Sequence, residues 1–126
     1  MIVSGKSATV TTTVTDKNTA NAVGSGSLDV FATPMMIALM EQAACKCIAD
    51  SLEPEQSSVG TQINVAHTAA SPLGAVVNAT AEIVSVDGRK ISFTVTAHDG
   101  VNEIGNGVHE RFVIDAERFM NKLEQR

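Results

Sequence analysis

Three polar side chains stand out in the sequence because of where each one lies: Thr33, Glu41 and His67. Glu41 interrupts an apolar run, and a carboxylate there needs either a partner or a raised pKa if it is buried. In a cleft, such a group could orient a histidine or activate water. The structural alternative is a carboxylate on a narrow exposed strip of a helix, because ionised groups avoid full burial.

His67 lies in a stretch that alternates like a β-strand, on the same face as Ile63 and Val65. An imidazole with an ordinary pKa of about 6.5 suits proton transfer at neutral pH, although a lone histidine among apolar residues is often only a core residue. Thr33 precedes Pro34 at the start of an apolar run, so its first expected role is a helix N-cap. Its hydroxyl becomes a good nucleophile only if a base takes its proton.

A helix over residues 33–52 is predicted to position two of these groups. Its apolar side chains go round the axis rather than along one stripe, which is typical of a helix enclosed by other structure. The N–H groups and positive dipole end at its start would suit an oxyanion or a phosphate. Cys45 and Cys47 lie about 200° apart around the axis, which disfavours a disulfide or a shared metal. We expect them to be two buried thiols in a reducing compartment.

The rest of the chain is predicted to wrap this helix. A first strand is expected at 7–15, then a glycine- and serine-rich loop or lid at 16–32. A polar connection at 53–58 leads into four strands, with Asp-Gly pairs as turns, and a short surface helix: 59–68, 75–86, 90–97, 102–116 and 117–126. An antiparallel sheet buries such a helix on one face. The predicted fold is therefore α+β, the hotdog arrangement of a sheet around one long helix.

Length and charge restrict the function classes. The 126 residues predict one domain, 1–126, large enough to fold without metal or disulfide. Net charge is −5, the 9 Lys and Arg residues do not cluster, and Trp and Tyr are absent, so nucleic acid is not an expected partner. The N-terminus lacks the apolar core of a signal peptide and no run is long enough to span a membrane. We expect a soluble, cytoplasmic protein.

Three stretches resemble acyl-CoA thioesterases of the hotdog fold, most closely the fluoroacetyl-CoA thioesterase subgroup. They read VFATPMMIALMEQAA, GTQINVAHTAASPLG and TAHDGVNEIGNGVHERFVI. The resemblance extends over about residues 30–119, with matching spacings. It implies an enzyme that hydrolyses an acyl-CoA thioester to the free acid and CoA, with no metal and no cofactor.

The resemblance also implies roles for particular residues. Thr33 at the helix start, Glu41 eight residues on and His67 in the next strand match the catalytic set of the subgroup. Gly60 and Arg111 match its substrate-binding positions. Their structural alternatives are a plain strand-entry glycine and an arginine that pairs with carboxylates on a solvated sheet face.

The chain also departs from the subgroup. GSGSLD replaces a longer lid with aromatic residues, and Pro34 replaces a glycine, which implies a less specialised acyl-CoA substrate than fluoroacetyl-CoA. These departures leave open an alternative function, a non-catalytic hotdog protein that binds acyl-CoA or a small apolar ligand. A hotdog hydratase is a weaker alternative, because the Asp and His pair of hydratases is missing.

The spacing of Thr33 and Glu41 bears on assembly. Eight residues of helix separate the two side chains by about 12 Å of rise and about 80° of rotation. Both cannot touch one reacting carbon from the same helix. If they cooperate, two helices must run antiparallel across a two-fold axis near Ile37 or Ala38. The sequence therefore predicts a homodimer with two shared sites, and leaves a dimer of dimers open.

Overall fold

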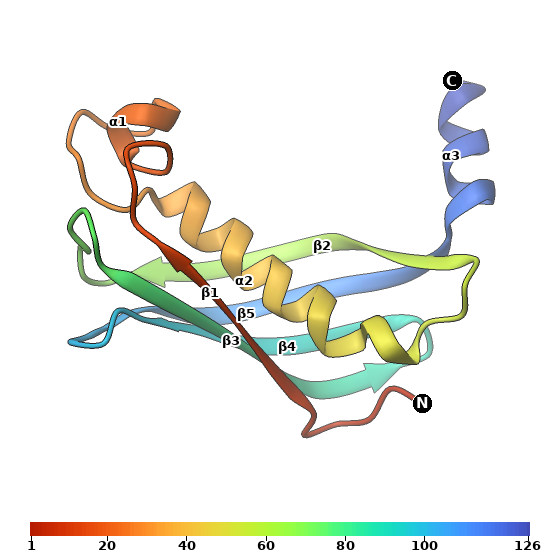
Figure 1. The fold of residues 1–126 in the computed structure, drawn as a ribbon. Helices are drawn as coiled ribbons and strands as arrows, with labels where there is room; N and C mark the ends of the chain where they lie inside the picture. The colour runs from red at the N-terminus through yellow and green to blue at the C-terminus, as the bar shows by residue number, and fades with distance from the viewer.

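The fold is one antiparallel sheet of five strands with a long helix across it (Figure 1). The computed structural model describes all 126 residues. Its elements in chain order are β1 Ser7–Thr13, α1 Ala20–Val23, α2 Thr33–Ile48, a 3-10 turn Ala49–Ser51, β2 Gln56–His67, β3 Val76–Asp87, β4 Lys90–His98, β5 Glu103–Asp115 and α3 Ala116–Glu124. The strands are ordered β1-β3-β4-β5-β2. The predicted hotdog arrangement is confirmed.

The core lies between α2 and the concave side of the sheet. Helix α2 packs mainly on β1 and β3, and Ala79 and Ala81 on β3 are small enough to let it approach closely. Large apolar side chains fill the space on either side. The buried helix residues are Met36, Leu39, Met40, Ala43, Ala44, Cys47 and Ile48, and they meet alternate residues of β3 and β4, among them Val77, Ile83, Ile91, Phe93 and Val95.

One prediction about α2 is wrong for the single chain, because the helix is not enclosed on all sides. Ile37 and Ala38 are only half-buried, and Cys45 is exposed while Cys47 is fully buried. The two cysteines differ because their positions around the axis place only one of them toward the sheet. One side of α2 therefore stays open along much of its length.

Smaller differences concern the ends of elements. The predicted lid contains the short helix α1, which Thr19 caps by accepting a hydrogen bond from the Ala22 N–H at 3.1 Å. Strand β2 begins at Gln56, inside the predicted polar connection, because Ser57 and Ser58 pair with β5. The α-helical part of α2 ends at Ile48, before the predicted end.

Strand β2 lies at one edge of the sheet, beside β5. Its other edge has no strand partner, and a bulge interrupts its pairing with β5 between Gly60 and Gln62. Helix α3 leaves the end of β5 and projects from the body of the molecule (Figure 1). No helix has the length and apolar character needed to cross a membrane.

Candidate active site

Thr33 and His67 meet where α2 begins and β2 ends. The Thr33 Oγ1 lies 2.8 Å from the His67 Nδ1. The prediction that Thr33 is the N-cap is wrong: Ala32 holds that position, and no side chain caps the helix. Thr33 is already the first helical residue, and its hydroxyl contacts the His67 ring instead of a backbone N–H. The expected cap thus becomes half of a hydroxyl–imidazole pair.

The state of the His67 ring follows from its surroundings. Burial lowers the pKa of His67, and the backbone of Ala69 opposes this in part. Its Nε2 is buried and has no hydrogen-bond partner. A neutral ring with its proton on Nε2 keeps the Nδ1 lone pair free to accept the Thr33 O–H. This is the hydrogen-bonded nucleophile and base arrangement that activates a hydroxyl.

A cavity of about 300 Å³ opens beside this pair. The loop around α1 forms one wall with Ala20, Ser25, Val30 and Phe31, and residues 67–70 of β2 and its following loop form another. Small side chains dominate the lining. Because Pro34 has no N–H, the start of α2 offers one donor fewer to a bound group than most helices do.

Glu41 lies at a second group of polar side chains, two turns along α2. Its Oε2 is 3.2 Å from the Arg111 Nη1, and its side chain is 42% exposed. Arg111 comes from β5 and is buried. Its Nε donates to the Ser58 Oγ at 2.9 Å and its Nη2 to the Ser58 carbonyl at 3.1 Å. The alternative of an arginine on a solvated sheet face is therefore wrong, because Arg111 is only 6% exposed.

Gly60 is the glycine that makes room for this group. A Cβ at this position would lie 2.7 Å from the Glu41 Oε2, 3.3 Å from the His109 Cε1 and 3.4 Å from the Arg111 Nη1. Real Cβ atoms do not approach an oxygen so closely, so only glycine leaves the carboxylate where it lies. Gly60 also stands at the β2 bulge, a feature common next to active sites.

His109 belongs to the same group, although it was not among the predicted site residues. Its Nε2 is 3.3 Å from the Arg111 Nη1 and 4.0 Å from the Glu41 Oε2. The signal was present in the alternation of β5, which places His109, Arg111 and Val113 on one face. That face is the buried one. Because two of its residues are polar, the sequence pattern did not mark it as buried.

The predicted site residues therefore form two groups within one chain. The first is Thr33 with His67, and the second is Glu41 with Gly60, Arg111 and His109. About 12 Å of helix separates them, and Glu41 does not contact His67. No three His, Cys, Asp or Glu side chains gather as a set of metal ligands.

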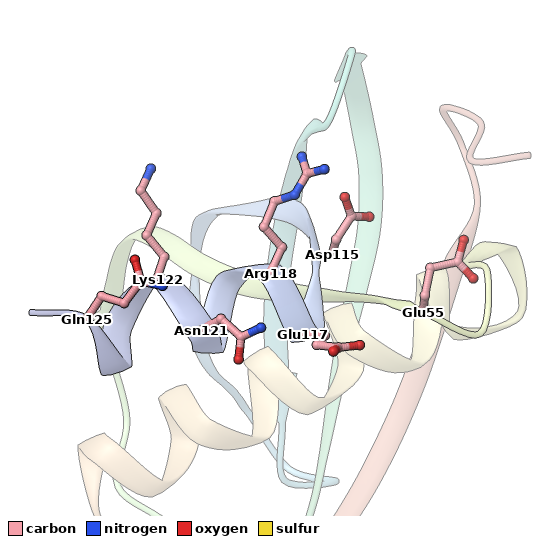
Figure 2. Close-up of a pocket in the computed structure, with 7 residues that line it drawn as sticks. All are labelled: Glu55, Asp115, Glu117, Arg118, Asn121, Lys122 and Gln125. Atoms are coloured by element: carbon pink, nitrogen blue, oxygen red, sulfur yellow. The ribbon is translucent and has the colours of Figure 1, made fainter.

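The largest hollow, about 680 Å³, lies elsewhere, along α3. Figure 2 shows its lining, which is wholly polar and of mixed charge: Glu55, Asp115, Glu117, Arg118, Asn121, Lys122 and Gln125. None of these is a predicted site residue. The chemistry of the side chains, rather than the size of a hollow, marks the candidate site.

Solved structures place the fold in a class. The structure of the fluoroacetyl-CoA thioesterase matches with a TM-score of 0.94 and 42% identity, covering 100% of this chain and 98% of that one. A Thermus thermophilus protein described as a thioesterase superfamily member matches with a TM-score of 0.90 and 27% identity, covering 100% and 96%. The chain is a hotdog-fold acyl-CoA thioesterase.

Sequence comparisons identify the family within this class of thioesterases. Residues 14–117 match the model of the fluoroacetyl-CoA-specific thioesterase family. The fluoroacetyl-CoA thioesterase of Streptantibioticus cattleyicolor is 53% identical over 98 residues, which is 78% of this chain and 70% of that protein. The chain belongs to the fluoroacetyl-CoA-specific thioesterase family, as the resemblance in the sequence implied.

Proposed function

We propose that the chain hydrolyses short acyl-CoA thioesters with Thr33, Glu41 and His67, brought together across the interface of a homodimer. The activity itself, thioester hydrolysis, is supported by the chain's membership of the family. The observation that supports the residues is the 2.8 Å contact between the Thr33 Oγ1 and the His67 Nδ1. It joins a hydroxyl to a base beside a cavity.

In the proposed reaction, His67 takes a proton at Nδ1 as an oxygen attacks the thioester carbonyl. The oxygen is either that of Thr33, giving an acyl-enzyme that water then cleaves, or that of a water molecule. The C–S bond breaks, and His67 returns the proton to the CoA thiolate. The positive imidazolium formed on the way has a buried Nε2 without a partner, so a nearby carboxylate would stabilise it.

Glu41 of a second copy is the carboxylate proposed for this role. Each group joins a residue of α2 to a residue of β2, the edge strand of the sheet. The half-buried Ile37 and Ala38 lie between them on the helix. A two-fold axis there would bring Thr33 and His67 of one chain to Glu41 of the other, and would cover apolar surface.

The proposed acyl group is short. The cavity beside Thr33 is about 300 Å³ and is lined mainly by small side chains. A variant of the fluoroacetyl-CoA thioesterase has been solved with fluoroacetate and CoA and matches this chain with a TM-score of 0.88 and 44% identity, covering 93% of this chain and 98% of that one. Since residues 20–29 of the lid carry no aromatic side chain and the only one in the lid, Phe31, is buried, we expect acetyl and fluoroacetyl esters to be cleaved at similar rates.

Gly60 and Arg111 complete the proposed substrate-binding set. The backbone at Gly60 can approach the thioester carbonyl closely because the residue has no Cβ. Arg111 is only 6% exposed, and its Nη1 is already bonded to Glu41. It is proposed to act on the substrate through the Glu41 carboxylate that it holds.

Mixing two inactive variants tests the shared site. Thr33→Ala and Glu41→Ala should each release little thiol from acetyl-CoA. A heterodimer of the two carries one intact and one doubly altered site. An equimolar mixture that exchanges fully should thus regain about a quarter of wild-type activity, because half the dimers are mixed. Absence of any recovery, with exchange verified by mass spectrometry, would rule out sharing across the axis.

Two further measurements define the reaction. Thiol release over acetyl-, fluoroacetyl-, butyryl- and octanoyl-CoA should show that rates fall for the longest chain and that fluorine has little effect. Trapping with hydroxylamine should intercept an acyl group if Thr33 is the nucleophile, and a single turnover in isotope-labelled water reports direct attack.

A further inference from the structure

His109 is a buried imidazole to which the reaction so far gives no role. It is 2% exposed, and its ring stacks on Phe93 of β4, with the ring centroids 5.9 Å apart. The His109 Nδ1 is 2.7 Å from the Gln62 carbonyl oxygen. Because a carbonyl only accepts, Nδ1 must carry the proton. In the neutral ring, Nε2 is then an acceptor.

Arg111 is the donor that this acceptor meets. A guanidinium has only donors, so the 3.3 Å contact between the Arg111 Nη1 and the His109 Nε2 is a hydrogen bond only when the imidazole is neutral. The same Nη1 lies 3.2 Å from the Glu41 Oε2. With Ser58 holding the Nε and Nη2, His109 fixes the one end of the guanidinium that reaches Glu41.

We propose that His109 is a positioning residue for thioester hydrolysis: its neutral ring holds the Arg111 guanidinium in place, and Arg111 in turn orients the Glu41 carboxylate. This inference rests on the proposed function of Glu41. The Glu41 side chain is 42% exposed, so the buried pair beneath it supplies the rigidity that a catalytic carboxylate needs. His109 never touches the substrate.

Burial of the His109 ring favours the required neutral state. Burial is the main cause that lowers the pKa of His109, and the Arg111 charge lowers it further. The Gln62 carbonyl, Glu41 and Glu110 act in the opposite direction. Protonation would place a hydrogen on Nε2 facing the Arg111 Nη1 and end their hydrogen bond. Acid should therefore release the Arg111 Nη1 from His109.

Two substitutions separate this role from simple packing. His109→Phe keeps a ring against Phe93 but removes the acceptor, and kcat should fall about 10- to 100-fold with KM nearly unchanged, the effect of losing a hydrogen bond to a charged group. His109→Gln restores an acceptor and should recover most of that loss. His98→Gln, at an exposed histidine at the end of β4, is the matched control.

The pH profile of kcat/KM gives a readout that packing would not change. In the wild type, His67 and His109 must both be neutral, so the acid limb should be steeper than one proton allows. In His109→Gln the slope of the acid limb should decrease to that of a single proton. An unchanged slope, with full activity in folded His109→Phe, would overturn the positioning role.

A double variant distinguishes this inference from the proposed function. In the Glu41→Ala background, His109→Phe should have no further effect, because His109 acts through Glu41. If the losses of activity from the two substitutions multiply, His109 acts independently of Glu41. That result would overturn this inference but not the proposed function. If Glu41→Ala itself keeps full activity, the proposed function fails first. Circular dichroism of each variant checks that it is folded.

Discussion

The two ends of the open side of α2 differ in almost every chemical respect. At the start, Thr33 and His67 form a pair without a formal charge beside a cavity. Two turns later, Glu41 meets Arg111 and His109 in a charged group whose inner members are buried. The first end has a hydroxyl beside an imidazole and no anion. The second has a carboxylate held by a buried guanidinium.

Under the proposed function, this difference means that a single chain holds only part of each site. A buried imidazole that must become positive needs a compensating charge, and the only carboxylate of the site lies about 12 Å along the helix. Each end supplies what the other lacks. The simplest arrangement that joins them is the antiparallel pairing of two α2 helices, which creates two equal sites.

The largest expected effect comes from separating the two chains of the proposed dimer, so that the Thr33 end of one no longer meets the Glu41 end of the other. Ile37→Glu places like charges close to the proposed two-fold axis, where Ile37 is half-buried. We expect loss of the dimer and a fall in activity of more than about 1000-fold, because both sites lose their partner. Sedimentation and thiol release measure the two effects. Gln42→Glu adds the same charge about 140° around the helix and is the control. An active monomer would refute the shared site.

The next largest effect is expected at the first end alone. His67→Asn removes the base that contacts the Thr33 hydroxyl, and kcat should fall about 10²- to 10⁴-fold, the usual contribution of general base catalysis. The matched variant Thr33→Ser keeps the hydroxyl and should stay within about tenfold of the wild type. If His67→Asn lost less than tenfold, the pair would be structural rather than catalytic.

The sequence predicted the fold well because its signals are local. The apolar run of α2 and the alternation of β3 and β4 fix the elements, and the Asp-Gly turns at Gly88 and Gly100 adopt the positive φ that glycine favours. The contact between Thr33 and His67 is observed, and their roles as hydroxyl and base stay a prediction. The ends of elements were less certain, because packing and pairing decide them.

Three features of the site could not be read from the sequence. Thr33 matched an N-cap, but a tertiary contact with His67 determines where its hydroxyl points. His109 and Arg111 lie on the buried face of β5, although polar residues in a strand usually mark the solvent face. Gly60 gave no sign of how near Glu41 would come. In each case a contact between distant segments overrides a local preference.

A smaller effect is expected at the second end from Gly60→Ala. The new Cβ would lie 2.7 Å from the Glu41 Oε2, so the carboxylate must turn away from Arg111. Since the Glu41 side chain is half exposed and can turn toward solvent, we expect the melting temperature to change little and kcat to fall about 10- to 100-fold. In the Glu41→Ala background the substitution should have no further effect. Equal losses in both backgrounds would show that Gly60 acts without Glu41.

The smallest effect concerns stability, and it compares the two histidines directly. Burial lowers the pKa of both His67 and His109, while in the unfolded chain each titrates near pH 6.5. Below that pH the unfolded state binds more protons, so the free energy of unfolding is highest above about pH 6.5 and falls as the pH decreases. The slope is at most about 1.4 kcal/mol per pH unit for each histidine.

Urea denaturation at about pH 7.5 and about pH 5.5, at constant protein concentration, measures this loss. The interval lies above the range where carboxyl groups titrate, so it isolates the histidines. His67→Asn and His109→Gln should each reduce the difference in stability between the two pH values, and the exposed His98→Gln should leave it unchanged. Because His109 is the more deeply buried ring, its substitution should flatten the profile more than that of His67. The reverse order would mean that Glu41 and the Gln62 carbonyl compensate a charged His109, and that the second end tolerates protonation better than the first.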